Sequence, residues 1–168
     1  TNGNPSTFYF TRDIATEVKQ ADGIEQASEQ TYISSLAAAC CDEKLQIIGY
    51  DPSTDFVIEP WVASQFKGTL EDGKMIAGAN VNVSTDGTIE LYGRKWPVVA
   101  QLANTGTSLD NSVFINQATV PDMVAASSKV SKQVMPMEYA GKAVSTVMIK
   151  VKQGYEAQTV AENIKRID

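Results

Sequence analysis

The side chains most often used in catalysis are scarce in this sequence, and histidine is absent from it. Without histidine the chain has no His-dependent catalytic triad, no histidine metal ligand and none of the most common general base. The glycine-rich sequences GxGxxG and GxxxxGKS/T, which bind nucleotide phosphates, are absent as well. We therefore do not expect nucleotide hydrolysis by this chain.

Three carboxylates, Asp51, Asp55 and Glu59, lie close together in the sequence. Asp51 and Asp55 match positions one and five of a calcium-binding loop. However, Phe56 stands where that loop requires glycine, and Val62 stands where it requires the closing glutamate. We therefore interpret the segment as a turn. A pair of acids for glycoside cleavage stays open, because the separation of two carboxylates is a property of the folded chain.

A Ser-Lys dyad and a cysteine site are the remaining options for chemistry. A dyad could be sought among two lysines and three serines, Lys129 and Lys132 near Ser127, Ser128 and Ser131. The context of a Ser-Lys motif is missing, so we interpret them as solvated neighbours at a polar helix end. Cys40 and Cys41 are adjacent and can bridge only through a strained ring. We interpret them as two small, partly buried thiols, with a redox-sensitive disulfide as the alternative. The sequence thus predicts no catalytic, cofactor-binding or metal-binding residue.

Composition limits the class of protein further. The 168 residues are enough for one domain, or for a domain with a smaller satellite. A formal charge of -6, with 14 scattered basic residues, argues against nucleic acid or anionic lipid as a direct ligand. No apolar run approaches the ~20 residues of a membrane helix. The chain starts at Thr1 without an initiator methionine, so we expect a piece excised from a longer protein.

The clearest strand and helix lie near the end of the chain. In 144–152, Val147, Ile149 and Val151 recur at period two, which predicts a half-buried strand. After Gly154 the period changes, and 155–167 has an apolar face at helical spacing with charged residues opposite.

The start of the chain has the same two elements in reverse order. Asp13 is expected to cap a short helix that ends at Asp22-Gly23, and an extended segment follows over 24–36. If the two terminal strands lie in one sheet, the four elements form a two-layer α+β unit, and the two ends of the chain emerge near each other.

The middle of the chain is expected to be mostly β. Strands are predicted at 45–50 and 74–78, with 56–61 as an extended or turning connector because Pro60 interrupts it. Between 80 and 116, short β segments alternate with turn residues, including a hairpin of 88–92 and 95–101 joined across Gly93-Arg94. A short helix is expected over 120–129. The predicted fold is α+β, with a core subdomain of 1–79 and 117–168 and an inserted β-rich subdomain of 80–116.

Five sequence features, taken in order, resemble the MacB-like periplasmic core domain of ABC transporter permeases of the MacB/FtsX type. They are the opening helix leading into Gly23-Ile-Glu-Gln-Ala27, the strand Leu45-Gln-Ile-Ile-Gly-Tyr-Asp-Pro52, the segment Leu70-Glu-Asp-Gly-Lys-Met-Ile-Ala-Gly78, the segment 92–102 followed by Asp110-Asn-Ser-Val-Phe-Ile115, and the closing strand and helix. The resemblance covers about Ser6 to Asp168. The stretch between Gly78 and Thr88 is shorter than the family often has, which affects the size expected for the inserted subdomain.

The resemblance implies a protein without chemistry or cofactor of its own. It implies a domain on the extracytoplasmic side of the cell membrane, with transmembrane helices expected before Thr1 and after Asp168. Through them the domain would relay ATP-driven motion from a cytoplasmic ATPase subunit to an exported substrate or an extracytoplasmic partner, beside a second permease copy. The alternative is a secreted or surface-anchored ligand-binding module without an ATPase, holding a small ligand between its subdomains. An enzyme is the third option.

A polar loop is the expected contact for partner or cargo, because recognition commonly uses polar loops on a rigid scaffold. Its candidate residues are Asn104, Thr105, Thr107, Ser108, Leu109, Asp110 and Asn111.

Overall fold

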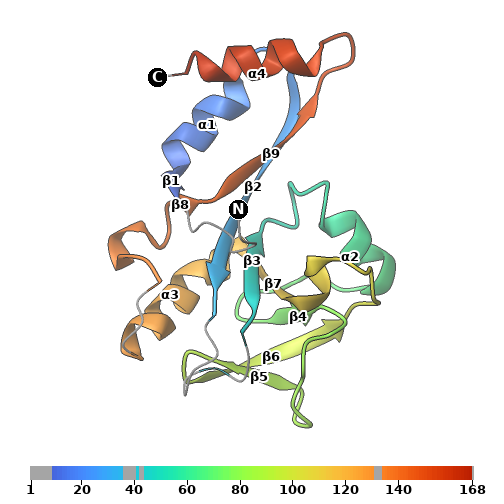
Figure 1. The fold of residues 1–168 in the computed structure, drawn as a ribbon, viewed down its shortest axis with the longest axis vertical. Coiled ribbons are helices and arrows are strands. Elements are labelled where there is room, and N and C mark those ends of the chain that lie inside the picture. The colour runs from blue at the N-terminus through green and yellow to red at the C-terminus, as the bar shows by residue number, and fades with distance from the viewer. Residues whose placement is uncertain (1–8, 36–40, 42–43, 131–133, 168) are drawn as a thin grey trace.

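The fold is an open, mixed sheet with helices on both faces (Figure 1). The computed structural model describes residues 9–35, 41, 44–130 and 134–167. In this part of the chain, no helix has the length and apolar character that crossing a membrane requires.

The strands are β1 (Phe10–Thr11), β2 (Ile24–Ser34), β3 (Gln46–Tyr50), β4 (Met75–Ala77), β5 (Thr88–Leu91), β6 (Arg94–Gln101), β7 (Ser112–Asn116), β8 (Ala143–Val144) and β9 (Thr146–Val151). The α-helices are α1 (Arg12–Gln20), α2 (Glu59–Gln65), α3 (Val120–Lys129) and α4 (Ala157–Lys165), and short 3-10 helices are η1 (Ser108–Asn111), η2 (Gln117–Thr119) and η3 (Met137–Tyr139). The prediction of an α+β fold is confirmed.

One sheet of seven strands has the order β5-β6-β4-β7-β3-β2-β9, and β1 pairs separately with β8. The parallel pairs are β3 with β7 and β4 with β6, and the other neighbours are antiparallel. Strands β6 and β7 hydrogen-bond directly to β4, so the segment 80–116 is continuous with the rest of the sheet. Its description as an inserted subdomain stays a prediction.

The elements predicted at the two ends of the chain pack together. Strand β2 pairs antiparallel with β9, and α1 and α4 lie side by side against this pair at one end of the molecule (Figure 1). Val18, Ile24 and Val160 form the buried centre of this unit. The Asn163 side chain donates to the Asp22 carbonyl, 3.1 Å away, and so joins α4 to the end of α1.

Two apolar clusters cover the central strands from opposite faces. Ile47 and Ile115 pack with α3 on one face, and Ile48 and Phe114 pack with α2 on the other. Successive residues of a strand point to opposite faces, so β3 and β7, whose described residues are buried or nearly so, contribute to both clusters. This double burial fixes the register of the strands that carry the site described below.

Three local predictions are wrong in detail. Helix α1 begins at Arg12, with Thr11 as its N-cap and Asp13 already in its first turn. No side chain caps the helix, and the N–H of Arg12, one of the unpaired donors of its first turn, bonds to the Lys142 carbonyl at 2.9 Å. The hairpin turns at Tyr92 and Gly93 rather than Gly93-Arg94, because both adopt positive φ, of 55° and 67°, as a two-residue turn of this type requires.

The segment 56–61 is the third correction. Residues 56–58 bend, in line with the turning alternative, but Glu59, Pro60 and Trp61 already form the first turn of α2. Pro60 lies in the first turn, where proline is tolerated because its missing N–H would have no helical partner. The buried Asp55 Oδ1 accepts the N–H groups of Val57, Ile58 and Glu59 and satisfies the donors at the start of the helix.

Candidate functional site

An open cleft of about 450 Å³ lies where the parallel strands β3 and β7 end. Its lining comes from α1, β2, the β3–α2 connection, η2 with the start of α3, and the segment before β8. The lining residues are Arg12, Lys19, Glu29, Asp51, Thr54, Asn116, Gln117, Ala118, Pro121, Ala140 and Gly141. The sequence did not predict this site.

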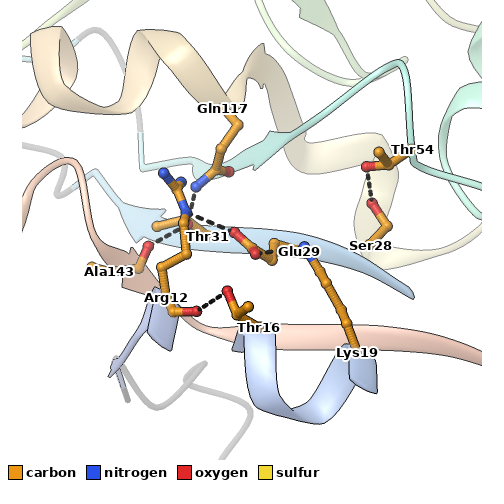
Figure 2. Close-up of polar contacts among 9 residues, drawn as sticks. All are labelled: Arg12, Thr16, Lys19, Ser28, Glu29, Thr31, Thr54, Gln117 and Ala143. Atoms are coloured by element: carbon orange, nitrogen blue, oxygen red, sulfur yellow. Dashed lines mark hydrogen bonds and ion pairs between the residues drawn. The ribbon is translucent and has the colours of Figure 1, made fainter. Parts of the chain in front are cut away.

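A buried carboxylate paired with two cations lies in the lining of the cleft, and Figure 2 shows the three side chains. Glu29 of β2 is 7% exposed. Its Oε2 accepts from Arg12 Nε at 3.0 Å, and its Oε1 accepts from Lys19 Nζ at 2.7 Å. Both cations come from α1 and are seven residues apart, which places them on one helix face. The pair of contacts therefore fastens α1 to the sheet by charge as well as by apolar packing.

A chain of hydrogen bonds connects the cleft to β8 (Figure 2). Gln117 Nε2 donates to Thr31 Oγ1 at 2.7 Å, and Thr31 Oγ1 donates to the Ala143 carbonyl at 2.8 Å. Among the described residues, the buried Gln117 Oε1 finds no donor. An unpaired buried acceptor lowers stability, so Gln117 is a polar side chain kept at some cost in the cleft wall.

The three carboxylates singled out in the sequence have structural roles. Asp51 Oδ1 accepts from the Ser53 N–H and hydroxyl, which is the turn expected from the sequence. Asp55 caps α2, and Glu59 accepts from the Tyr50 hydroxyl at 2.9 Å. Burial, and then this bond to Glu59, raise the pKa of Tyr50. No group of three potential metal ligands occurs in the described part of the chain.

The other candidates for chemistry also have ordinary contacts. The Ser127 hydroxyl is buried and donates to the Val124 carbonyl, and the Ser128 hydroxyl donates to the Ala125 carbonyl. Cys41 is buried, and its Sγ accepts the Tyr92 N–H at 3.3 Å.

Several members of the earlier predictions lie outside the described residues. They are Cys40, Ser131 and Lys132. The vicinal disulfide therefore stays an untested alternative.

The predicted contact loop is a compact turn around one aspartate. Asp110 is 2% exposed, and its carboxylate accepts from the Thr105 N–H and hydroxyl and from the Gly106 N–H, at 2.8–2.9 Å. Removal from water raises the pKa of Asp110, but the hydrogen bonds from Thr105, Gly106 and Thr107 outweigh this and hold it below its ordinary value. The Thr107 hydroxyl caps η1 by accepting the Leu109 N–H.

The loop offers a different surface from the one its sequence suggests. Asp110 is used inside it, and Leu109 is half-buried, so neither presents its full side chain to a partner. The exposed candidates are Asn104, Thr105, Thr107, Ser108 and Asn111. The loop precedes β7 and the cleft follows it, so the two surfaces lie at opposite ends of this strand.

Solved structures of similar fold were found, although no protein-family model matches this chain and the comparison with curated proteins gives no significant match. The periplasmic region of MacB from Actinobacillus actinomycetemcomitans matches with a TM-score of 0.54 at 9% identity, over 92% of this chain and 71% of that one. This chain has the fold of the MacB periplasmic region. The extracellular domain of YknZ, a noncanonic ABC-type transporter from Gram-positive bacteria, matches with a TM-score of 0.48 at 12% identity, over 92% of this chain and 78% of that one.

The likeness agrees with the family resemblance seen in the sequence. The signal for the cleft, in contrast, was weak in the sequence. Lys19 lay within the predicted helix, but Arg12 preceded the expected cap at Asp13, and their partner Glu29 lies beyond the helix in an extended segment with several polar residues. Only the fold brings the three together.

Proposed function

We propose that this chain is a non-catalytic extracytoplasmic domain of an ABC transporter permease. The observation that carries the proposal is the likeness in fold to the MacB periplasmic region. The proposed partners are a cytoplasmic ATPase subunit, reached through transmembrane helices at both ends of the domain, and a second permease copy. The proposed task is to relay the ATP-driven motion of those helices to an exported substrate or an extracytoplasmic partner.

The arrangement of the terminal elements supports this task. A force applied at both ends of the domain would enter through α1 and α4, which pack on the same pair of strands. Glu29 adds two charge-assisted bonds between α1 and β2. From β2 the sheet continues without interruption through β3 to β7, which begins at the loop of 104–111. Bonded strands in a packed sheet move as a unit, so they suit the transmission of motion.

We assign the contact with cargo or partner to the exposed side chains of this loop. Its backbone is fixed by Asp110, and Gly78 packs directly against the carbonyl groups of Leu109 and Asp110. A loop held in one conformation loses little entropy on binding, which favours recognition. Exposed hydroxyl and amide groups such as those of Ser108 and Asn111 suit a polar protein surface.

A matched pair of substitutions tests the loop in the native, full-length protein. Ser108→Arg places a bulky cation on the loop, and Ser128→Arg places the same side chain at the exposed end of α3. We expect Ser108→Arg to reduce transport or partner activation at least tenfold at unchanged protein level, and Ser128→Arg to leave it near wild type. Equal activity of the two variants would remove the loop from the proposal.

The permease assignment itself is tested by the native gene product. We expect a species well above 18.1 kDa that is extracted only by detergent and copurifies with an ATPase. A soluble product near this mass would refute the assignment. It would favour the second candidate, a ligand-binding module without an ATPase, for which the cleft of about 450 Å³ is the supporting observation.

A further inference from the structure

We propose that the cleft at the ends of β3 and β7 binds a zwitterionic ligand of the amino-acid or short-peptide class. This site is separate from the loop of 104–111, and the inference does not rest on the permease assignment. It rests on the position of the cleft, on the unused hydrogen-bonding groups in its walls and on the balance of charge among them.

The position of the cleft favours a ligand. In open α/β sheets, ligands bind beyond the carboxyl ends of the parallel strands. Strands β3 and β7 are parallel neighbours, with Tyr50 opposite Asn116 at their last pair. The next residues along each strand, Asp51 and Gln117, both line the cleft. Its volume of about 450 Å³ lies within the range of about 300–1,000 Å³ for small-molecule sites.

One wall provides donors for a carboxylate. Glu29 engages Arg12 through Nε and Lys19 through one N–H of its ammonium group. In the described part of the chain, the two Nη groups of Arg12 have no acceptor, and its side chain is 45% exposed. A planar pair of Nη groups matches the two oxygens of a carboxylate. Since Glu29 already holds the guanidinium in place, binding requires little further ordering of the side chain.

Another wall provides acceptors for an ammonium group. Asp51 uses Oδ1 for the turn with Ser53, whereas its Oδ2 has no donor among the described residues. Thr54, also in the cleft lining, is held by a 3.0 Å bond from its hydroxyl to that of Ser28 (Figure 2). The free oxygen of Asp51 therefore lies on a connection that is fixed to β2.

The charges of the lining select the class of ligand. The two cations Arg12 and Lys19 balance the two carboxylates, Glu29 and Asp51, so the cleft has no formal net charge. The charges are nevertheless unevenly placed, because the two cations on α1 exceed Glu29 by one positive charge, and the second carboxylate lies after β3. A dianion such as phosphate would be attracted by the cations of α1 but repelled by the like charge of the Asp51 carboxylate. A zwitterion satisfies both ends, because its carboxylate pairs with Arg12 and its ammonium group with Asp51.

Isothermal titration calorimetry on this chain, with alanyl-alanine as the probe, tests the inference. The comparison probes are N-acetyl-alanyl-alanine, alanyl-alanine amide and inorganic phosphate. We expect saturable binding of the free dipeptide, at least fivefold weaker binding of each blocked form, and weaker binding of phosphate still. No saturable heat with alanyl-alanine or free alanine, or equal affinity for the blocked forms, would overturn the proposal.

Two conservative variants locate the binding. Asp51→Asn keeps the oxygen that accepts from Ser53 but removes the charge, so it should abolish the preference for a free ammonium group. Arg12→Lys keeps a cation for Glu29 but removes the planar fork, so it should weaken the dipeptide at least fivefold. The control is Lys150→Gln, which removes an exposed ion pair on β9 and should change nothing. Wild-type affinity in both cleft variants would place the ligand elsewhere and refute the assignment.

Discussion

The double ion pair of Glu29 gives the sharpest test of how α1 is held to the sheet. Glu29→Gln preserves size but removes the charge. The amide keeps one oxygen as acceptor, and its NH₂ group is a donor, so one of the two cations loses its acceptor. Each bond to a charged group contributes about 1.5–3 kcal/mol when enclosed. Because the two cations are 45% and 36% exposed, solvent screening reduces this. We expect the free energy of unfolding to fall by about 1–3 kcal/mol.

The assay is urea unfolding, and the matched control lies on the same strand. Glu25 pairs with Lys150, but both side chains are about half exposed, at 46% and 53%. Glu25→Gln should therefore cost less than about 0.5 kcal/mol. A cycle of Glu29→Gln with Lys19→Met should give a coupling energy of about 0.5–2 kcal/mol. If the two glutamine variants lose the same stability, or the cycle shows no coupling, the reasoning about burial is refuted.

Two further predictions concern a glycine and an aspartate. A Cβ on Gly78 would overlap the backbone of the 104–111 loop, so Gly78→Ala should lower the free energy of unfolding by about 1–3 kcal/mol. The control is Gly141→Ala, where the added Cβ meets open space. In the same urea assay it should change the free energy of unfolding by less than about 0.5 kcal/mol. The bond from Lys95 holds the pKa of Asp86 at about 2, below 3.8, so the carboxylate stabilises the fold above about pH 4 and loses this effect as the pH falls toward 2. Wild type should therefore exceed Asp86→Asn in urea midpoint at pH 6, with the difference vanishing near pH 2, and a difference that does not change with pH would contradict this.

Much of the local secondary structure could be predicted from the sequence. The period-two pattern of Val147, Ile149 and Val151 predicted β9, and all three pack in the terminal apolar cluster. Helix α3 has the predicted bounds of 120–129. These predictions succeed because the burial of one face imposes a regular spacing of apolar residues, which remains visible without knowledge of any distant contact.

Where the sequence misled, a contact from elsewhere in the chain or an uncommon conformation decided the outcome. Asp55 converts an apolar segment with a proline into the start of α2 by accepting three N–H groups. Asp110 was predicted as part of a contact surface, but its carboxylate accepts hydrogen bonds from N–H groups within the loop and so fixes the loop's conformation. In both cases a polar side chain has two opposite uses, and spacing does not distinguish them.

By itself, the sequence determined the α+β class, most of the strands and helices, and the absence of histidine chemistry. These follow from composition and short-range periodicity. Only the tertiary structure placed Glu29 between Arg12 and Lys19 and brought Asp51 and Gln117 to the ends of two parallel strands. Strand order and pairing join residues that are far apart along the chain, as with Thr31 and Ala143. No local pattern encodes such pairs, because their contact free energy arises only once the whole sheet has formed.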